Sequence, residues 1–201
     1  MGYLVGITGN SGCGQSTAAE FIARQCSGVC SLDRVGHRLL NRSYVHRDLA
    51  DAFSNNAFLT MSENEIRSRL GKIVFEDSDK LSALNSVLHP RMIRWVKNAS
   101  AILSGDEGIW VLEGALIYEL GLDRYLDCVI VIADTAERSA ERLAVRDDIS
   151  TNDARRRWIQ QFPILKKSSL ADYIVYNSKD LDYMRQQILT IFEEIKGVML
   201  T

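Results

Sequence analysis

The chain has 201 residues, of which 46% are hydrophobic and 25% are charged, and its formal net charge is −2. This composition is that of a globular protein with room for one α/β domain and a modest insertion. So small a charge gives no general attraction to nucleic acid or anionic membranes, and no apolar stretch approaches the roughly 18 residues that predict a membrane span. We therefore expect neither nucleic acid nor membrane as a partner.

A glycine-rich segment follows the first predicted strand. Residues 3–8 are apolar enough for a buried strand, and residues 17–24 form a helical pattern. Between them, residues 9–16 match the phosphate-binding pattern G-x-x-x-x-G-K-[ST], except that Gln15 stands at the lysine position. A strand, a glycine loop and a helix are the context that this pattern requires, because inward-turned N–H groups and a helix N-terminus attract phosphate. The alternative is a glycine-rich turn that binds nothing.

From this segment we predict an ATP site. The expected nucleotide-binding residues are Gly9, Asn10, Ser11, Gly12, Cys13, Gly14, Gln15, Ser16 and Thr17. Ser16 is placed to offer its hydroxyl group to Mg²⁺. The missing lysine normally neutralises charge that builds during transfer, and the loss of one such donor typically costs about 3–4 kcal/mol of barrier. Most of the cradle is main chain, so we expect nucleotide binding to suffer less than turnover.

The four cysteines are Cys13, Cys26, Cys30 and Cys128, and they form neither a C-x-x-C pair nor a zinc spacing with the histidines. We interpret them as small buried thiols in a reducing compartment. Cys13 is the exception, because oxidation or alkylation inside the glycine loop would block the site. The N-terminus shows no signal-peptide pattern. We expect a cytoplasmic protein that is a monomer or a weak homo-oligomer.

The remaining elements alternate along the chain. Further strands are expected over residues 28–33, 109–113, 128–133 and 173–176. Helices are expected within 36–54, after a capping box at Ser62–Glu65, over 78–87 and 90–103 with His89-Pro90 between them, and over 136–146, 150–161 and 180–196. Short apolar strands that alternate with helices predict a parallel five-stranded sheet flanked by helices on both faces. Its ligand site should lie beyond the carboxyl ends of the strands.

Two carboxylates end predicted strands at that edge. Asp33 follows the second strand, and Glu113 ends the third. A carboxylate at Asp33 can face the terminal phosphate and orient, or deprotonate, an acceptor hydroxyl group. Alternatively, Asp33 caps a helix that begins at Arg34. The residues themselves leave both interpretations open.

A basic region lies later in the chain. Arg142 and Arg146 are four residues apart on one helix face, and Lys166 and Lys167 follow, with more arginines at 155–157. A basic helical hairpin that closes over the nucleotide neutralises the transferring phosphoryl group and excludes water. The alternative is a solvated basic face.

Taken in order, these segments resemble the dephospho-coenzyme A kinases, a branch of the P-loop kinases, over nearly the whole chain. Residues 31–37 resemble D-A-D-x-x-x-H, with Asp33 on the second aspartate and Ser31 in place of the first. Residues 69–75 and 84–90 are similar to R-x-x-L-G-x-x-V-F and L-x-x-x-x-H-P. Residues 113–119 resemble D-x-P-L-L-F-E with four substitutions. Residues 157–161 and 171–177 are similar to R-I-x-x-Q and A-D-x-V-I-x-N.

The resemblance implies transfer of the γ-phosphate of ATP to the ribose 3′-hydroxyl group of dephospho-coenzyme A, with ATP and Mg²⁺ as cofactors. It implies that Asp33, Arg142 and Arg146 are catalytic. The acceptor-binding residues would be His37, His89, Glu113, Leu116 and Glu119. It also implies a single P-loop kinase domain over 1–201, with a core (about 1–35, 105–140 and 170–201), a helical acceptor-binding part (about 36–104) and a lid (about 142–168).

Four interpretations remain at this stage. The first is an active kinase whose rate is reduced by Gln15. The second is a catalytically impaired or inactive homologue that binds nucleotide or coenzyme; Gln15 and Ser31 favour it, whereas intact Ser16, Asp33 and Arg142 oppose it. Another small-metabolite kinase is the third, and the His89-Pro90 and Glu113 segments weaken it. The fourth is that Gln15 was engineered to trap a complex.

Overall fold

The computed structural model describes residues 2–74 and 77–199, and it divides the chain into two compact units. We call Met1–Leu32 with Ala99–Thr201 the phosphate-loop unit, and Asp33–Asn98 the helical unit. The expected boundaries of core, acceptor-binding part and lid remain predictions. Phe75, the last residue of one segment that resembles the kinase family, lies outside the described residues.

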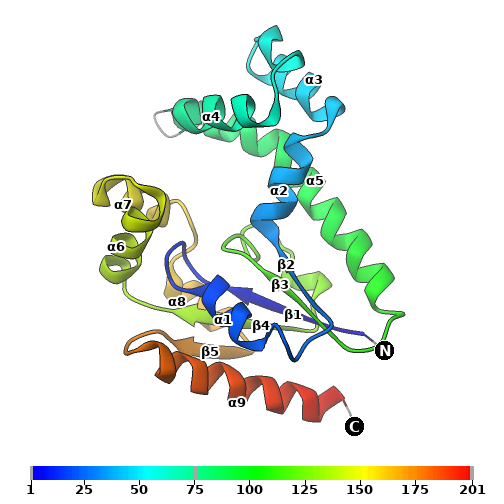
Figure 1. Ribbon diagram of the computed structural model, residues 1–201, viewed down its shortest axis with the longest axis vertical. Helices are drawn as coiled ribbons and strands as arrows, with labels where there is room; N and C mark the ends of the chain where they lie inside the picture. The colour runs from blue at the N-terminus through cyan, green and yellow to red at the C-terminus, as the bar shows by residue number, and fades with distance from the viewer. Residues whose placement is uncertain (1, 75–76, 200–201) are drawn as a thin grey trace. The chain divides into compact units, whose positions relative to one another are not determined.

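A five-stranded sheet forms the centre of the phosphate-loop unit (Figure 1). Its strands are β1 (Tyr3–Thr8), β2 (Gly28–Ser31), β3 (Ile109–Glu113), β4 (Cys128–Ala133) and β5 (Tyr173–Tyr176). All pairings are parallel, and the strand order is β2-β3-β1-β4-β5. The predicted parallel sheet is therefore confirmed. Glu113 lies opposite both Ile7 and Ser31, so β1, β2 and β3 end at the same edge.

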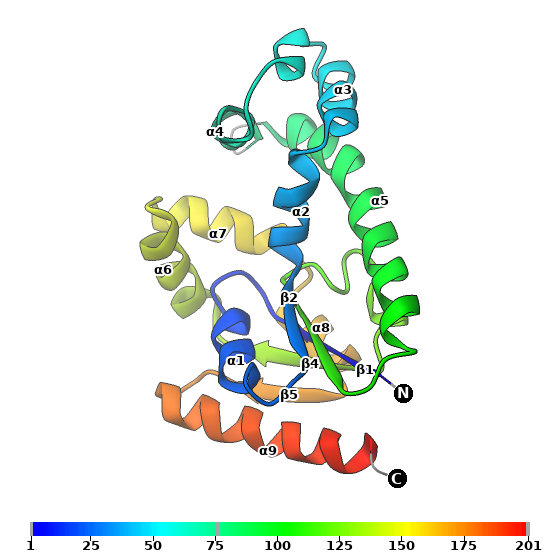
Figure 2. The same ribbon diagram turned by 45° about the vertical axis from the view of Figure 1, so that its right-hand side comes forward.

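Helices cover both faces of this sheet. Figure 2 shows α1 (Gln15–Ile22) and α9 (Leu181–Met199) next to each other against the strands. They share one buried cluster with Ile130 and Ile132 of β4. The alternate residues Val129 and Val131 pack instead against the segment that leads into α8 (Ile164–Leu170). Successive side chains of a strand point to opposite faces, so the continuous apolar sequence of β4 is explained by burial on both sides.

Two helices, α6 (Ala136–Asp147) and α7 (Thr151–Ile159), pack against each other through Ala140, Leu143 and Ala154. Each begins at the residue type that caps helices. The Thr135 hydroxyl oxygen accepts from the Arg138 N–H at 3.3 Å, and that of Ser150 accepts from the Asp153 N–H at 3.1 Å. Both predicted helices are thus confirmed.

The helical unit has its own core. It contains most of α2 (Leu32–Leu40), α3 (Ser43–Ala52), the 3₁₀ turn η1 (Asn56–Leu59), α4 (Glu63–Val74) and most of α5 (Ser78–Leu103). Its buried side chains are Leu40, Val45, Leu49, Ala50, Phe58, Ile66, Leu70 and Val87. The capping box before α4 is confirmed, because the Glu65 carboxylate accepts from the Ser62 N–H at 2.7 Å. A second 3₁₀ turn, η2 (Asp123–Tyr125), belongs to the phosphate-loop unit. Within residues 2–74 and 77–199, no helix is long and apolar enough to cross a membrane.

The structure corrects the expected strand over 28–33. The strand ends at Ser31, and Leu32 already begins α2. Buried Leu32, Val35 and Leu39 follow a helical repeat, and this repeat overrides the apparent continuation of the strand. Asp33 consequently lies in the first turn of a helix, where a negative charge is favourable, and not at a strand end.

A second correction concerns the expected turn at His89-Pro90. The segments 78–87 and 90–103 form one continuous helix, α5, with Pro90 inside it. Proline costs a helix interior one N–H donor and about 3 kcal/mol. The buried side chains of Val87, Met92 and Val96 hold the helix on both sides of the proline, so packing outweighs the local preference.

Candidate functional site

The glycine loop joins β1 to α1 in the conformation that its glycines permit. Gly12 and Gly14 have φ angles of +85° and +98°, in the left-handed region. A Cβ atom on Gly12 would lie 2.1 Å from the Ser139 carbonyl oxygen, and one on Gly14 would lie 2.9 Å from the Asn177 amide nitrogen. Gly14 is the N-cap of α1 and has no side chain to cap it. The first N–H groups of α1 are thereby directed toward a ligand.

The loop is held from behind by residues far away in the sequence. The buried Asn10 amide donates to the Phe162 carbonyl oxygen at 3.1 Å. The Ser11 N–H donates to the Gln161 side-chain oxygen at 2.8 Å, and the Gln161 amide donates to the Ser11 hydroxyl oxygen at 2.8 Å. The Asn177 amide donates to the Cys13 carbonyl oxygen at 2.9 Å. These bonds fix the loop before any ligand arrives.

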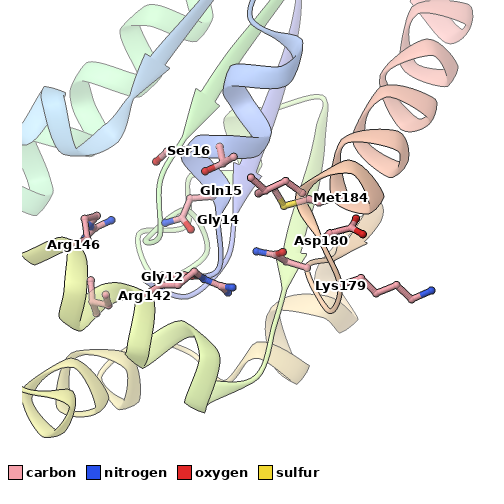
Figure 3. Close-up of a pocket in the computed structure, with 13 residues that line it drawn as sticks. Gly12, Gly14, Gln15, Ser16, Arg142, Arg146, Lys179, Asp180 and Met184 are labelled. Carbon is pink, nitrogen blue, oxygen red and sulfur yellow. The ribbon is translucent and has the colours of Figure 1, made fainter.

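A pocket of about 600 Å³ opens in front of the loop (Figure 3). It is lined by Gly12, Gly14, Gln15, Ser16, Thr17, Arg142, Leu143, Arg146, Asn177, Lys179, Asp180, Leu181 and Met184. Figure 3 shows Gln15 between the α6 arginines on one side and Lys179, Asp180 and Met184 on the other. Of the predicted nucleotide-binding residues, Gly12 and Gly14 to Thr17 therefore line the pocket, whereas Gly9, Asn10 and Cys13 are buried in the structure behind it.

Gln15 is 7% exposed and is the first residue of α1. The next residue, Ser16, donates its hydroxyl group to the Glu113 carboxylate at 3.0 Å. A hydroxyl and a carboxylate oxygen at a helix N-terminus are hard oxygen donors of the kind that Mg²⁺ prefers, so these two residues fit a magnesium ion.

The two predicted catalytic arginines differ in their surroundings. Arg142 donates through Nε to the Gly12 carbonyl oxygen at 2.9 Å, and its guanidinium also pairs with Asp134. Arg146 is exposed and pairs with Asp147 at 2.8 Å. Although burial by itself raises it, hydrogen bonds and charges from Arg146 and Arg157 lower the pKa of the Asp147 carboxyl group. Arg142 therefore supports the loop, while Arg146 belongs to a more exposed network beside the pocket.

Lys167 is buried and does not line the pocket, in contrast to the expectation of a basic face over the nucleotide. It is 0% exposed and lies in α8, a helix that the sequence pattern did not predict. Its ammonium group donates to the Ala115 carbonyl oxygen at 2.6 Å and to the Gly9 carbonyl oxygen at 3.3 Å, and it pairs with Glu119 at 2.9 Å. Burial lowers the pKa of Lys167, and the Glu119 charge opposes this shift in part. The lysine thus ties the start of the glycine loop to the segment after β3.

Cys13 is also buried, with its thiol 3.4 Å from the Ser139 hydroxyl oxygen. Burial raises the pKa of this thiol, so the protonated, unreactive form is favoured. The possibility of oxidation or alkylation at Cys13 is therefore not supported.

The residues predicted to contact the acceptor are divided between the two units. Asp33 and His37 lie one turn apart on α2, both exposed, and His89 lies on α5. These three belong to the helical unit, whereas Glu113, Leu116 and Glu119 belong to the phosphate-loop unit. Burial lowers the pKa of His89. Glu119 accepts from the Phe162 N–H at 2.8 Å as well as from Lys167, so this carboxylate already holds two segments together.

Sequence reasoning missed the role of three polar residues. All three are buried: Asn10 donates to Phe162, Lys167 donates to Gly9, and Asp134 pairs with Arg142, which in turn donates to Gly12. Lys167 lies one helical turn after Ile164 and one turn before Ala171, and this spacing was the available signal of burial. No local pattern identifies its partners.

The sheet order, the glycine loop and the lined pocket define a nucleotide-dependent kinase of the P-loop class. A solved protein from Thermus thermophilus has the same fold, with a TM-score of 0.75 and 25% identity over 96% of each chain. Residues 3–182 match the dephospho-CoA kinase family, and the chain belongs to that family.

Individual relatives agree with this membership. The dephospho-CoA kinase of Aquifex aeolicus is 31% identical over 95% of this chain and 96% of the relative. The structure of dephospho-CoA kinase from Campylobacter jejuni superimposes with a TM-score of 0.70 and 26% identity, and it covers 98% of this chain and 99% of its own. The resemblance found in the sequence is confirmed.

Proposed function

We propose that this chain transfers the γ-phosphate of ATP to the ribose 3′-hydroxyl group of dephospho-coenzyme A and so completes coenzyme A synthesis. The family match over residues 3–182 carries the choice of reaction. The 600 Å³ pocket in front of the glycine loop supports ATP as the phosphate donor, because its volume suits a nucleotide and its wall is built around main-chain N–H groups.

The triphosphate of ATP would rest against the loop and the N-terminus of α1. Phosphoryl transfer requires little covalent help from a protein, so catalysis depends on positioning and charge neutralisation. Arg146 lines the pocket from an exposed position, and we expect its guanidinium group to move toward a phosphate group. Arg142 would contribute charge from a fixed position beside Gly12.

A magnesium ion would be held by Ser16 with Glu113 close by, where the two side chains now share a hydrogen bond. Bound there, Mg²⁺ would neutralise phosphate charge during transfer. Because the Glu113 carboxylate is mostly buried, its charge is weakly screened by solvent and favours a cation at this position.

For the acceptor, we propose that Asp33 orients the 3′-hydroxyl group and accepts its proton. His37, one turn along α2, and His89 would help to hold the acceptor in the helical unit. Glu113, Leu116 and Glu119 would contribute from the segment after β3, with Glu119 acting mainly through its bonds to Lys167 and to Phe162. Four free thiols suit a reducing cytoplasm, and we expect a monomer or a weak homo-oligomer.

A second candidate function is nucleotide or coenzyme binding with impaired catalysis. The observation that favours it is Gln15, which lines the pocket at the lysine position of the loop pattern. A glutamine amide can donate a hydrogen bond, but it cannot neutralise phosphate charge.

One assay separates the two functions. ADP release with dephospho-coenzyme A is measured for the chain and for Gln15→Lys, with calorimetry of Mg·ATP binding alongside. We expect slow turnover by the chain and an increase of about 100- to 1000-fold in kcat for the variant, since a preorganised donor is restored. If both proteins bind ATP with micromolar affinity and neither releases ADP, the kinase function is wrong and the binding function stands.

A further inference from the structure

A buried carboxylate lies behind the nucleotide pocket without lining it. Asp134 follows β4 directly, and its side chain is 1% exposed. One of its oxygens accepts from the neighbouring Thr135 N–H at 2.8 Å. Two arginines of α6, Arg138 and Arg142, also meet this carboxylate. A buried charge is tolerated only when it is paired. The two arginines therefore offset the cost of burying the Asp134 carboxylate, and the carboxylate in turn holds both arginines in place.

The first arginine connects Asp134 to the glycine loop. Arg142 pairs with Asp134 and donates through Nε to the Gly12 carbonyl oxygen at 2.9 Å. On the other side of the same peptide, the Cys13 N–H donates to the Asn10 carbonyl oxygen at 2.9 Å. The Gly12–Cys13 peptide is therefore held at both ends. Its carbonyl oxygen points to a cation of the protein, and so it does not face an anionic ligand.

The second arginine connects Asp134 to the opposite wall of the pocket. Arg138 lies 3.7 Å from the Asp134 carboxylate and donates to the carbonyl oxygens of Ser178 and Lys179 at 2.6 and 3.2 Å. This turn leads into α9, and its residues 179–181 line the pocket. The turn and the glycine loop are thus attached to one carboxylate through two arginines.

We propose that Asp134 is a positioning residue for the nucleotide, which sets the distance between the glycine loop and the 178–181 turn through Arg142 and Arg138. The inference rests on the proposed function in one respect, which is that the bound nucleotide is ATP. Asparagine at this position keeps the shape of the side chain but removes its charge. Both guanidinium groups then lose their fixed anion, and both walls of the pocket become free to shift.

The test uses the whole chain and measures Mg·ATP binding by calorimetry together with steady-state kinetics. For Asp134→Asn we expect Kd and KM for ATP to rise about 10- to 100-fold, as for the loss of a hydrogen bond to a charged group. The KM for dephospho-coenzyme A should change less than about threefold, within the scatter of independent sites. Asp134→Glu, which restores the carboxylate, should recover part of the ATP affinity. The matched control is Glu193→Gln, which removes a surface ion pair with Lys196 on α9. It should leave the Kd and the KM for ATP unchanged.

A double variant tests the connection itself. If Asp134 acts through the two arginines, then Asp134→Asn with Arg142→Met should lose less ATP affinity than the two single losses added together, because the connection through Arg142 is lost only once. Additive losses, or wild-type ATP affinity in Asp134→Asn, would overturn the proposal. Should Asp134→Asn show no thermal transition and so fail to fold, Arg138→Gln is measured in its place, because it breaks the connection between Asp134 and the 178–181 turn. Unchanged ATP affinity in Arg138→Gln would overturn the proposal as well.

The binding measurement requires no acceptor, and it therefore separates this inference from the proposed function. A chain that binds Mg·ATP but does not phosphorylate dephospho-coenzyme A refutes the proposed reaction, while the role of Asp134 is still decided by calorimetry. A chain that does not bind Mg·ATP refutes both.

Discussion

The two units of this protein carry their candidate residues in opposite ways. In the phosphate-loop unit, the site is held by bonds between distant segments, such as Gly9 with Lys167 and Ser11 with Gln161. In the helical unit, Asp33 and His37 are exposed on the surface of α2. One site is fixed before its ligand arrives, and the other presents side chains that are free to adjust.

This difference has a chemical reason. A triphosphate is bound mainly through charge and main-chain N–H groups, and such groups act best when they are preorganised. A hydroxyl acceptor must be aligned at the moment of transfer, which exposed side chains on a separate unit can do. Substitutions of the residues that hold the glycine loop should therefore change stability and ATP affinity, whereas substitutions of Asp33 and His37 should change transfer alone.

The largest effect is expected at Asp33, which tests the claim that exposed residues of the helical unit change transfer but not ATP affinity. Asp33→Asn removes the proposed base and should lower kcat by about 100- to 10,000-fold with ATP affinity nearly unchanged. ADP release and calorimetry measure the two quantities. Asp79→Asn is the matched control, because Asp79 also lies in the first turn of a helix in this unit, and it should leave kcat unchanged. A comparable loss of ATP affinity in Asp33→Asn would mean that Asp33 is a structural residue or a metal contact.

The next effect is expected at Lys167, on the phosphate-loop side. Lys167→Met leaves the Glu119 carboxylate without its buried cation, and loss of one partner of a buried pair typically costs about 3–5 kcal/mol. The free energy of unfolding is measured in urea. The neighbouring Lys166 is exposed and lies 3.6 Å from the centre of the Phe162 ring, so Lys166→Met should cost at most about 1 kcal/mol. If Lys167→Met and Lys166→Met lower the free energy of unfolding equally, the buried contacts of Lys167 do not stabilise the fold more than an exposed lysine does.

The sequence predicted the sheet and the glycine loop correctly because both depend on local patterns. The apolar run Cys128–Ala133 requires burial on both faces, and the glycines at 12 and 14 are required by positive φ angles. Local patterns also explain the errors. The apolar residues of segment 28–33 fit both the two-residue repeat of a strand and the 3.6-residue repeat of a helix. Only packing decides that the strand ends at Ser31.

Two features could not be predicted from local sequence. Proline normally ends a helix, but α5 continues through Pro90 because buried residues flank it on both sides, Val87 before it and Met92 and Val96 after it. Likewise, Lys167 looked like a lid cation beside Lys166, and its three acceptors come from segments 48 to 158 residues away. Long-range partners of buried polar groups are properties of the fold, and a single sequence does not contain them in readable form.

The smallest effect concerns His89 in the helical unit. Burial favours the neutral imidazole and lowers the pKa of His89 below its ordinary value of 6.5, so the unfolded chain takes up a proton more readily. The stability that this histidine contributes is therefore fully present above pH 6.5 and is lost as the pH falls through the folded-state pKa. Thermal unfolding of the chain and of His89→Gln, measured from pH 7.5 to 5, should diverge, with the variant losing less stability in acid. If the two curves stay parallel, protonation of His89 is not linked to unfolding.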